Sequence, residues 1–524
     1  MYASAEHIIM TQGKRVVLNA LTTYCRSIVG IVLGLFSTRW VVQGLGKMDF
    51  GLYSLVGATI AFMAVFNSIL NGSVARYYAY EIGAGKKGSS AFDVENLIKW
   101  FNTAFVLHAG LAILVLVFGY PLGYAAITKW LVIPPERLEA CMIVFHLALA
   151  SCIVSIIVAP YLAMFYATQN IVETSLWGIL SVVCVCLSAL AILRYDGDRM
   201  KLYSVLFVGS QVVVNMCMVV RSRIRFAACR LRLAELFDKG RIKSLLCFAG
   251  WQLYAAFGDM VRMQGTAFVI NKCWGVGINA SYAISNQVAG QTGSLSQALQ
   301  NAISPAIIAK TGEGNESAVS GYVESANKIS ALLIAVFTVP LSMEMGYVLR
   351  LWLGFVPEYA GTLCICTLVM VFIDRLSGGS MMAVVASGKV GAYQCCAGTL
   401  AMISVLFIFG CHQYGFGPVT VGVVFIFLNA LKTVFRLYFA RRLMGFSASA
   451  WLRKVFLPIV FVCLCTLAVC GVVRIAIEES LLRVLLSSLA SVAVIGILSW
   501  FVIFNVQEQA LIRNICVSLV RKAR

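Results

Sequence analysis

The chain has 524 residues, of which 60% are hydrophobic and only 12% are charged. Soluble domains carry about 25% charged residues, so this composition excludes a soluble protein and indicates an integral membrane protein. The formal net charge is +19, yet no motif of aromatic and basic residues points to nucleic acid. The Lys and Arg residues are better explained as signals of membrane topology.

We expect no cleavable signal peptide, because residues 1–13 are polar and no small-residue cleavage site follows the first apolar run. Eighteen cysteines are present, mostly inside apolar runs, and several form CxC pairs whose thiols would point apart on a helix. No Cys/His set has the spacing of a zinc site. The cysteines are therefore interpreted as small buried hydrophobic residues, and no metal or cofactor is predicted.

Hydrophobic periodicity predicts an all-α membrane protein with about fourteen transmembrane helices. The crossings are expected at 16–38, 51–73, 97–119, 138–160, 173–193, 201–221, 245–271, 280–309, 321–344, 360–386, 391–410, 417–437, 455–476 and 482–505. The loops between them are short, which leaves no room for a soluble catalytic domain.

The distribution of positive charge predicts that both termini are cytoplasmic. With that orientation, the cytoplasmic segments hold 24 of the 41 Lys and Arg residues, the opposite side holds 11, and six fall within helices. Lys and Arg are enriched on the cytoplasmic side of membrane proteins, so this orientation is favoured.

The segment RSRIRFAACRLRLAELFDKGRIK, Arg221–Lys243, is the longest polar piece between crossings and is interpreted as a linker between two lobes. The predicted domains are an N-lobe of six crossings (1–222), the basic linker (223–243), a C-lobe of six crossings (244–440), and a final part with two crossings and a tail (441–524). The linker could bind anionic lipid headgroups, but a solvated topology anchor is the favoured interpretation.

An internal repeat supports this division. A shift of 229 residues aligns eight identities in 54 positions, which is about twice the chance level: Gly46/Gly275, Tyr53/Tyr282, Leu70/Leu299, Gly83/Gly312, Gly85/Gly314, Val94/Val323, Glu95/Glu324 and Lys99/Lys328. Six crossings are an even number, so the two copies would run the same way through the membrane. Parallel repeats of this kind are related by an axis along the membrane normal.

The stretch from Cys273 to Ala309 has no charged residue, yet thirteen of its residues are Ser, Thr, Asn or Gln. At helical spacing its apolar residues fall on one side: Ile284, Val288, Leu295, Leu299, Ile303 and Ile307. Its polar residues fall mostly on the other: Asn286, Gln287, Gln291, Ser294, Gln297, Asn301 and Ser304. Lipid does not tolerate such a face, so this helix is predicted to line a polar path, with a tightly packed, amide-bonded helix as the alternative.

Charged residues in the middle of the predicted crossings are candidates for function. Arg26 lies near the middle of its helix, with no acid within one turn. Asp259 and Arg262 are three residues apart and can pair on one helix face, either as a binding group or only as an internal salt bridge. Asp374 and Arg375 are adjacent, point about 100° apart, and need other partners. Arg26, Arg262 and Arg375 are predicted to form a cationic cavity suited to phosphate.

Three further charged residues, Glu173, Lys328 and Lys432, are close enough to the cytoplasmic helix ends to reach water and are not assigned a function. An enzyme is not predicted. The chain has only four histidines, and it lacks an HExxH motif, a nucleophile elbow and a P-loop. The longest extracytoplasmic loop, about Gly119–Arg137, is mostly apolar, unlike that of a membrane glycosyltransferase or polymerase.

Three stretches resemble one family. The segment RVVLNALTTYCRSIVGIVLGLFSTRWVVQGLGKMDFGLYSLVG (Arg15–Gly57) is similar to the start of polysaccharide-type, Wzx-like flippases. The segments RYYAYEIGAGK (Arg76–Lys86) and NASYAISNQVAGQTGSLSQALQNAISPAIIAKTGEGN (Asn279–Asn315) resemble that family's loop after helix 2 and its helix 8. These flippases belong to the multidrug/oligosaccharidyl-lipid/polysaccharide exporter (MOP) superfamily, which also contains the MATE drug exporters.

The resemblance implies two six-helix lobes arranged as a V, two additional C-terminal helices, and transport by alternating access. It implies flipping of an undecaprenyl-pyrophosphate-linked oligosaccharide across the bacterial inner membrane, with membrane lipids and other polysaccharide assembly proteins as partners. A cation-coupled MATE-type exporter is the alternative, although the first helix carries Arg26 where such exporters commonly place acids. Teichoic-acid and peptidoglycan-precursor flippases, and proton or sodium coupling, are left open.

Overall fold

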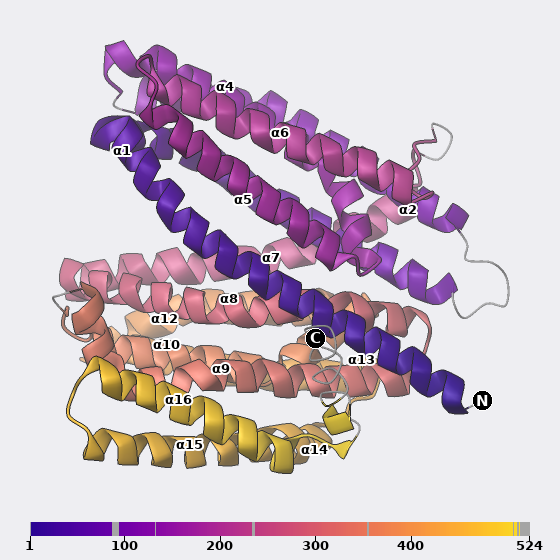
Figure 1. Ribbon diagram of the computed structural model, residues 1–524, viewed down its shortest axis with the longest axis vertical. Coiled ribbons are helices and arrows are strands. Elements are labelled where there is room, and N and C mark those ends of the chain that lie inside the picture. The colour runs from indigo at the N-terminus through magenta and orange to yellow at the C-terminus, as the bar shows by residue number, and fades with distance from the viewer. Residues whose placement is uncertain are drawn as a thin grey trace, which may run out of the picture. The chain divides into compact units, whose positions relative to one another are not determined.

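The computed structural model describes residues 2–85, 94–131, 133–232, 236–353, 356–506, 508–510 and 513 (Figure 1). All regular structure in these ranges is helical. Ten of their helices are long and apolar enough to cross a membrane, or eleven if the bent pair α10 (Ala360–Arg375) and α11 (Gly378–Ser387) is one span. The predicted all-α membrane architecture is confirmed, whereas the number fourteen stays a prediction.

The helices pack into two compact units, described separately below. The first unit contains the described residues within 17–249 and 312–314, and the second contains the described residues within 250–311 and 315–513 together with those before Val17. The division falls inside α7 (Lys239–Trp274), between Ala249 and Gly250.

The first unit is built from α1 from Val17 onward, α2 to α6 and the beginning of α7. Its elements are α1 (Tyr2–Gly85), α2 (Val94–Leu114), the π-helical turn η1 (Val115–Gly119), α3 (Tyr120–Ala125), the π-helical turn η2 (Ala126–Trp130), α4 (Pro135–Ala167), α5 (Ile171–Leu193) and α6 (Arg199–Arg225). Helices α4, α5 and α6 lie side by side (Figure 1). The core of this unit includes Val56 of α1 together with Phe145, Ile156 and Ile192 of α4 and α5, all fully buried.

Helix α1 is two helices joined at Gly46, whose φ of 75° is readily adopted only by glycine. Ion pairs stabilise the structure around this turn. Arg137, at the start of α4, pairs with Asp49 and lies 3.1 Å from Asp198, which caps α6. These contacts hold the start of the second half of α1 close to the starts of α4 and α6.

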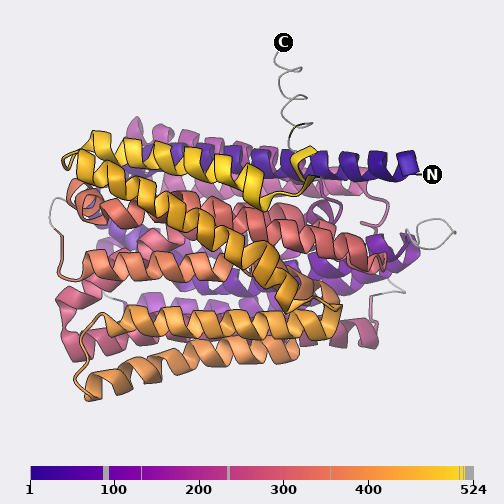
Figure 2. The ribbon, with the colours of Figure 1, turned by 90° about the horizontal axis from the view of Figure 1, so that it is seen from below.

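The second unit contains α7 to α16. After α7 come α8 (Val276–Gly312), α9 (Glu316–Leu353), α10, α11, α12 (Gly391–Gln413), α13 (Thr420–Met444), α14 (Ala448–Trp451), η4 (Leu452–Phe456), α15 (Leu457–Ala476), α16 (Leu481–Leu498) and η5 (Ser499–Ile503). Figure 2 shows α15 and α16 as neighbouring helices, and both pack on α9.

Small residues allow this close packing. Ala331 and Ala335 of α9 are fully buried against α15 and α16, as expected where dispersion contacts drive helix association in lipid. A buried ion pair reinforces it, with Arg483 Nη2 of α16 2.7 Å from Glu344 Oε2 of α9. The two C-terminal helices are therefore an integral part of the second unit.

Positions aligned by the 229-residue shift have matching local structure. Gly46 and Gly275 both join two helices with a positive φ, 75° and 88°. The pairs Glu95–Lys99 and Glu324–Lys328 both form ion pairs four residues apart, at 3.6 and 2.7 Å. These aligned positions therefore share local structure as well as residue type, while the repeat itself stays a prediction.

Candidate functional site

The site in the second unit is built around a break between α10 and α11. The sequence predicts one crossing over 360–386, but the structure breaks it after Arg375 with a bend of 48°. The physical reason lies in the following Ser-Gly-Gly, because glycine is a poor helix former. Asn327 of α9 stabilises the new helix start, where its Oδ1 accepts bonds from the backbone N–H of Gly379 and Ser380 at 2.7 and 3.3 Å.

A helix that ends inside a membrane leaves backbone carbonyls without partners, and these must be satisfied by protein. Arg436 of α13 meets this need. Its Nη1 donates to the backbone oxygen of Asp374 and to Ser377 Oγ, both at 2.9 Å, and its Nε donates to Tyr393 Oη at 3.0 Å. The Arg436 side chain is only 2% exposed, so this arginine is a structural part of the break.

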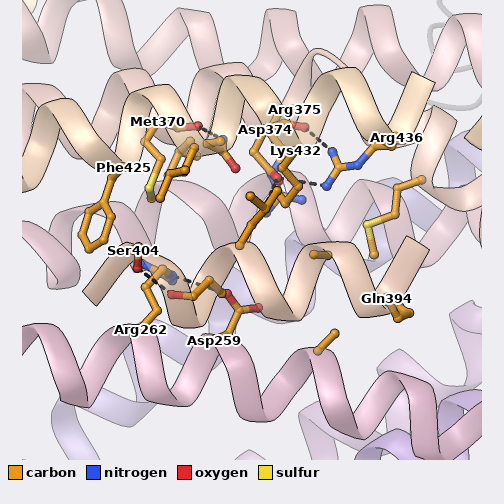
Figure 3. Close-up of a pocket in the computed structure, with 18 of the residues that line it drawn as sticks. Asp259, Arg262, Met370, Asp374, Arg375, Gln394, Ser404, Phe425, Lys432 and Arg436 are labelled. Carbon is orange, nitrogen blue, oxygen red and sulfur yellow. Dashed lines mark hydrogen bonds and ion pairs between the residues drawn. The ribbon is translucent and has the colours of Figure 1, made fainter. Parts of the chain in front are cut away.

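Three cationic side chains lie next to the Asp374 carboxylate (Figure 3). Its Oδ1 lies 3.0 Å from Lys432 Nζ and 3.1 Å from Arg436 Nη2, and its Oδ2 lies 3.7 Å from Arg375 Nε. That Arg375 Nε is buried and has no hydrogen-bond partner among the described residues. One negative charge against three positive charges leaves the group with a surplus of two positive charges.

This cluster opens on a cavity of about 490 Å³ inside the second unit. Its polar and charged walls come from α7, α8, α10, α12 and α13: Asp259, Arg262, Gln297, Gln300, Asp374, Arg375, Tyr393, Gln394, Ser404, Asn429, Lys432 and Arg436. The volume is in the range of ordinary ligand pockets. Five of the ten site residues named from the sequence line it, namely Asp259, Arg262, Gln297, Asp374 and Arg375.

The pairing expected for α7 is present. Arg262 Nε lies 3.4 Å from Asp259 Oδ1, and the Arg262 guanidinium lies 5.2 Å from the centre of the Phe425 ring. The Asp259 side chain is 65% exposed, whereas that of Arg262 is 22% exposed. The carboxylate therefore reaches solvent, and the guanidinium is held against an aromatic wall by a cation–π contact.

The polar side of α8 is exposed and its apolar side is buried. Gln287, Gln291, Ser294, Gln297 and Asn301 are exposed, while Asn286 and Ser304 are half-buried. Gln297 Nε2 donates to Asn301 Oδ1 at 3.1 Å, so these two amides partly satisfy one another.

On the other side Leu299, Ile303 and Ile307 are buried, Ile284 and Val288 are half-buried, and the side chain of Leu295 lies outside the described residues. Among the described polar residues of α8, Gln297 and Gln300 line the cavity around Asp374.

Arg26 belongs to the first unit, where it lies against α5. A Cβ placed on Gly178 would lie 2.3 Å from Arg26 Nε and 2.5 Å from its Cζ. The absence of a side chain at Gly178 therefore makes room for the guanidinium. The structure brings Arg262 and Arg375 together in the second unit, while Arg26 is positioned by its own neighbours in the first.

Sequence reasoning missed Lys432 and Arg436. The sequence places Lys432 at a helix end within reach of water and gives Arg436 no function, but both pair with Asp374. Lys328 was likewise expected to reach water. It is instead 3% exposed and held between Glu324 and Glu508, at 2.7 and 3.2 Å. The four-residue spacing of Lys432 and Arg436 on one helix face was the available signal.

A fourth charge, Glu173, was expected to be solvated and is paired with Arg221 and Arg225 at 2.6 and 2.8 Å. Part of the basic linker is thus engaged with α5. Within the described residues, no group of three or more His, Cys, Asp or Glu side chains could hold a metal ion.

Comparison with known proteins identifies the fold. No protein-family model and no curated protein matches the sequence. Among solved structures, a MATE protein in the bent conformation is similar with a TM-score of 0.70 at 13% identity, covering 83% of this chain and 97% of that one.

Two further solved structures have a similar fold. An outward-facing multidrug resistance MATE family transporter of the MOP superfamily gives a TM-score of 0.68 at 13% identity, covering 83% of this chain and 96% of that one. A MOP superfamily transporter from Pyrococcus furiosus, described as having a binding pocket of reverse polarity, gives 0.65 at 14% identity, covering 84% and 96%. The chain therefore has the fold of MATE transporters over most of its length.

Proposed function

We propose that this protein is a flippase that carries an undecaprenyl-pyrophosphate-linked oligosaccharide from the cytoplasmic to the periplasmic leaflet of the bacterial inner membrane by alternating access. The MATE-like fold supports a transporter rather than an enzyme. The observation that carries the choice of cargo is the cationic surplus around Asp374 in the cavity of the second unit.

The charge of the cavity favours an anion. Its lining holds four cations (Arg262, Arg375, Lys432 and Arg436) and two carboxylates (Asp259 and Asp374), a net charge of 4 − 2 = +2. Uncompensated charge at membrane depth is costly, so an anionic ligand would stabilise this arrangement. Pyrophosphate suits a guanidinium, because its oxygens accept the forked hydrogen bonds that Arg offers. The amides of Gln297, Gln300 and Gln394 could serve sugar hydroxyl groups.

A cation-coupled multidrug exporter is the second candidate, and one observation favours it. Asp259 is a largely exposed carboxylate that lines the cavity, with a single cationic partner at 3.4 Å. A cationic drug or a coupling ion could bind there. Asp374 is a poor site for either, because three side-chain cations already surround it. The Pyrococcus furiosus neighbour, described as having a pocket of reverse polarity, indicates that polarity varies within this fold.

The test is the export of surface polysaccharide in a flippase-deficient bacterial strain that expresses the chain or its variants at matched membrane levels. Arg375→Gln and Lys432→Gln should each lower export and cause lipid-linked oligosaccharide to accumulate on the cytoplasmic side. Lys389→Gln is the matched control, because Lys389 is exposed and does not line the cavity. Full export by the double variant Arg375→Gln/Lys432→Gln would refute the proposal that these cations bind the pyrophosphate of the cargo.

A drug assay separates the two candidates. The flippase predicts no change in drug resistance when the chain is expressed, and only a small effect of Asp259→Asn on export. The exporter predicts raised resistance that Asp259→Asn abolishes. Raised resistance together with failure to restore polysaccharide export would replace the first proposal by the second.

A further inference from the structure

A second cavity lies in the second unit, at the turn that connects α13 to α14. Its volume is about 400 Å³, and it is separate from the cavity around Asp374. One wall is the beginning of α9 and the other is the segment from Met444 to Val455. Because this turn joins two candidate membrane spans, Thr420–Met444 and Ala448–Ala476, the cavity lies where the chain emerges from one membrane face.

The wall formed by α9 is polar, because polar residues recur along it at helical spacing. Glu316, Ser320 and Glu324 are four residues apart and share one helix face. Asn327 continues this face to the base of the cavity, where it is 2% exposed and its Nδ2 donates to Ser380 Oγ at 3.2 Å. Eleven residues of helix rise about 16 Å, so the cavity extends from the membrane surface toward the hydrocarbon region.

The charges of this cavity differ from those of the first. Glu316 and Glu324 face a single lining cation, Lys454, which gives a net charge of −1. Glu324 is already engaged, since it pairs with Lys328 at 2.7 Å and with Lys454 at 3.4 Å. Glu316 is exposed and forms no ion pair with the described residues. Glu316 is therefore the carboxylate available to a ligand.

The opposite wall is apolar and aromatic. Leu437, Phe446 and Val455 line it together with Trp451, whose Nε1 donates to the backbone oxygen of Leu376 at 2.9 Å. Trp is enriched at the membrane–water interface, where its ring contacts acyl chains and its N–H is satisfied. A ligand of this cavity should thus have both an apolar part and a polar head.

We propose that this cavity binds a phospholipid with a primary ammonium headgroup, such as phosphatidylethanolamine. The ammonium group would lie at Glu316, and the phosphate would lie toward Lys454 and Ser447, with the acyl chains along Phe446 and Val455. The negative lining disfavours an anionic headgroup, and the apolar wall favours a lipid over a water-soluble amine. The site is independent of the cargo proposed above, because it involves none of the residues of the cationic cavity.

The test uses the full chain, purified in detergent and freed of lipid, with bound lipids counted by native mass spectrometry. The probes are phosphatidylethanolamine, its N-acetylated form, which lacks the ammonium charge, and phosphatidylglycerol. We expect phosphatidylethanolamine to bind best. Glu316→Gln should lower this preference by up to about fivefold, the range of an exposed ion pair. Glu316→Lys should turn the preference toward phosphatidylglycerol.

Glu478→Gln is the matched control, because Glu478 is an exposed carboxylate beyond the other end of α15. It should leave the preference unchanged. Lys454→Gln is the second variant. It should weaken the binding of phosphatidylethanolamine and of phosphatidylglycerol, because it removes the cation near the phosphate. Equal binding of the three lipids, or an unchanged preference in Glu316→Lys, would overturn the proposal. If soluble glycerophosphoethanolamine bound as well as phosphatidylethanolamine in the same measurement, the cavity would be a site for an amine and not for a lipid, and the proposal would be wrong.

Discussion

Removal of the Asp374 carboxylate should destabilise the second unit strongly, because it leaves Arg436 buried without its counter-charge. The Arg436 side chain is 2% exposed and lies 3.1 Å from Asp374 Oδ1. Breaking a buried ion pair from one side costs about 3–5 kcal/mol, since the remaining charge is left uncompensated. The Asp374 side chain is 22% exposed, so we expect the lower end, about 3 kcal/mol, for Asp374→Ala.

A loss of about 3 kcal/mol lowers the ratio of folded to unfolded protein by about two powers of ten, because a factor of ten corresponds to about 1.4 kcal/mol. The assay is reversible unfolding of the purified chain in mixed micelles, with the unfolding free energy extrapolated to the absence of denaturant. Asp374→Asn should cost less than Asp374→Ala, because its amide oxygen can still accept a hydrogen bond from Arg436.

The double variant Asp374→Asn/Arg436→Gln tests the pair itself. Its destabilisation should be smaller than the sum of the two single effects, since neutral partners leave no buried charge. Asp259→Ala is the control, because the Asp259 side chain is 65% exposed and its 3.4 Å ion pair with Arg262 should contribute no more than about 1 kcal/mol. If Asp374→Ala cost no more than Asp259→Ala, Arg436 would be stable without a counter-charge, and the assigned role of the cluster would be wrong.

Four other outcomes are expected. Gly178→Ala should displace the Arg26 guanidinium, and both it and Arg26→Gln should reduce polysaccharide export at unchanged expression. Arg26→Lys keeps the charge and should keep part of the export. Burial raises the pKa of the Cys229 thiol to about 11, from an ordinary 9.0, so at pH 8 its thiolate fraction is about 100-fold lower and maleimide should not label it. A cysteine in place of the exposed Arg230 should be labelled from the cytoplasmic side only; labelling from outside would reverse the predicted orientation. A cysteine at Gln291 should react with an impermeant thiol reagent while cysteines on the buried side of α8 stay protected, and equal protection of both sides would favour a packed helix.

The features that depend on residues close together in the chain could be predicted from the sequence. Composition alone established the membrane environment, and helical spacing separated the polar and apolar sides of α8, whose exposure in the structure agrees with that division. The pair Asp259–Arg262 was expected because residues three apart on a helix face each other. The constant 229-residue offset identified Gly46 and Gly275, which both adopt a positive φ.

Other features could be decided only by the tertiary structure, because they depend on contacts between distant segments. The sequence indicates that Asp374 needs partners beyond the adjacent Arg375, which the structure nevertheless places 3.7 Å from it. The closer partners are Lys432 and Arg436, about sixty positions further along the chain on another helix. The bend after Arg375 is held by Asn327 of α9 and by Arg436 of α13, neither of which is a local signal. Helical periodicity tells which side of a helix is polar, whereas packing determines which charges meet and which become buried.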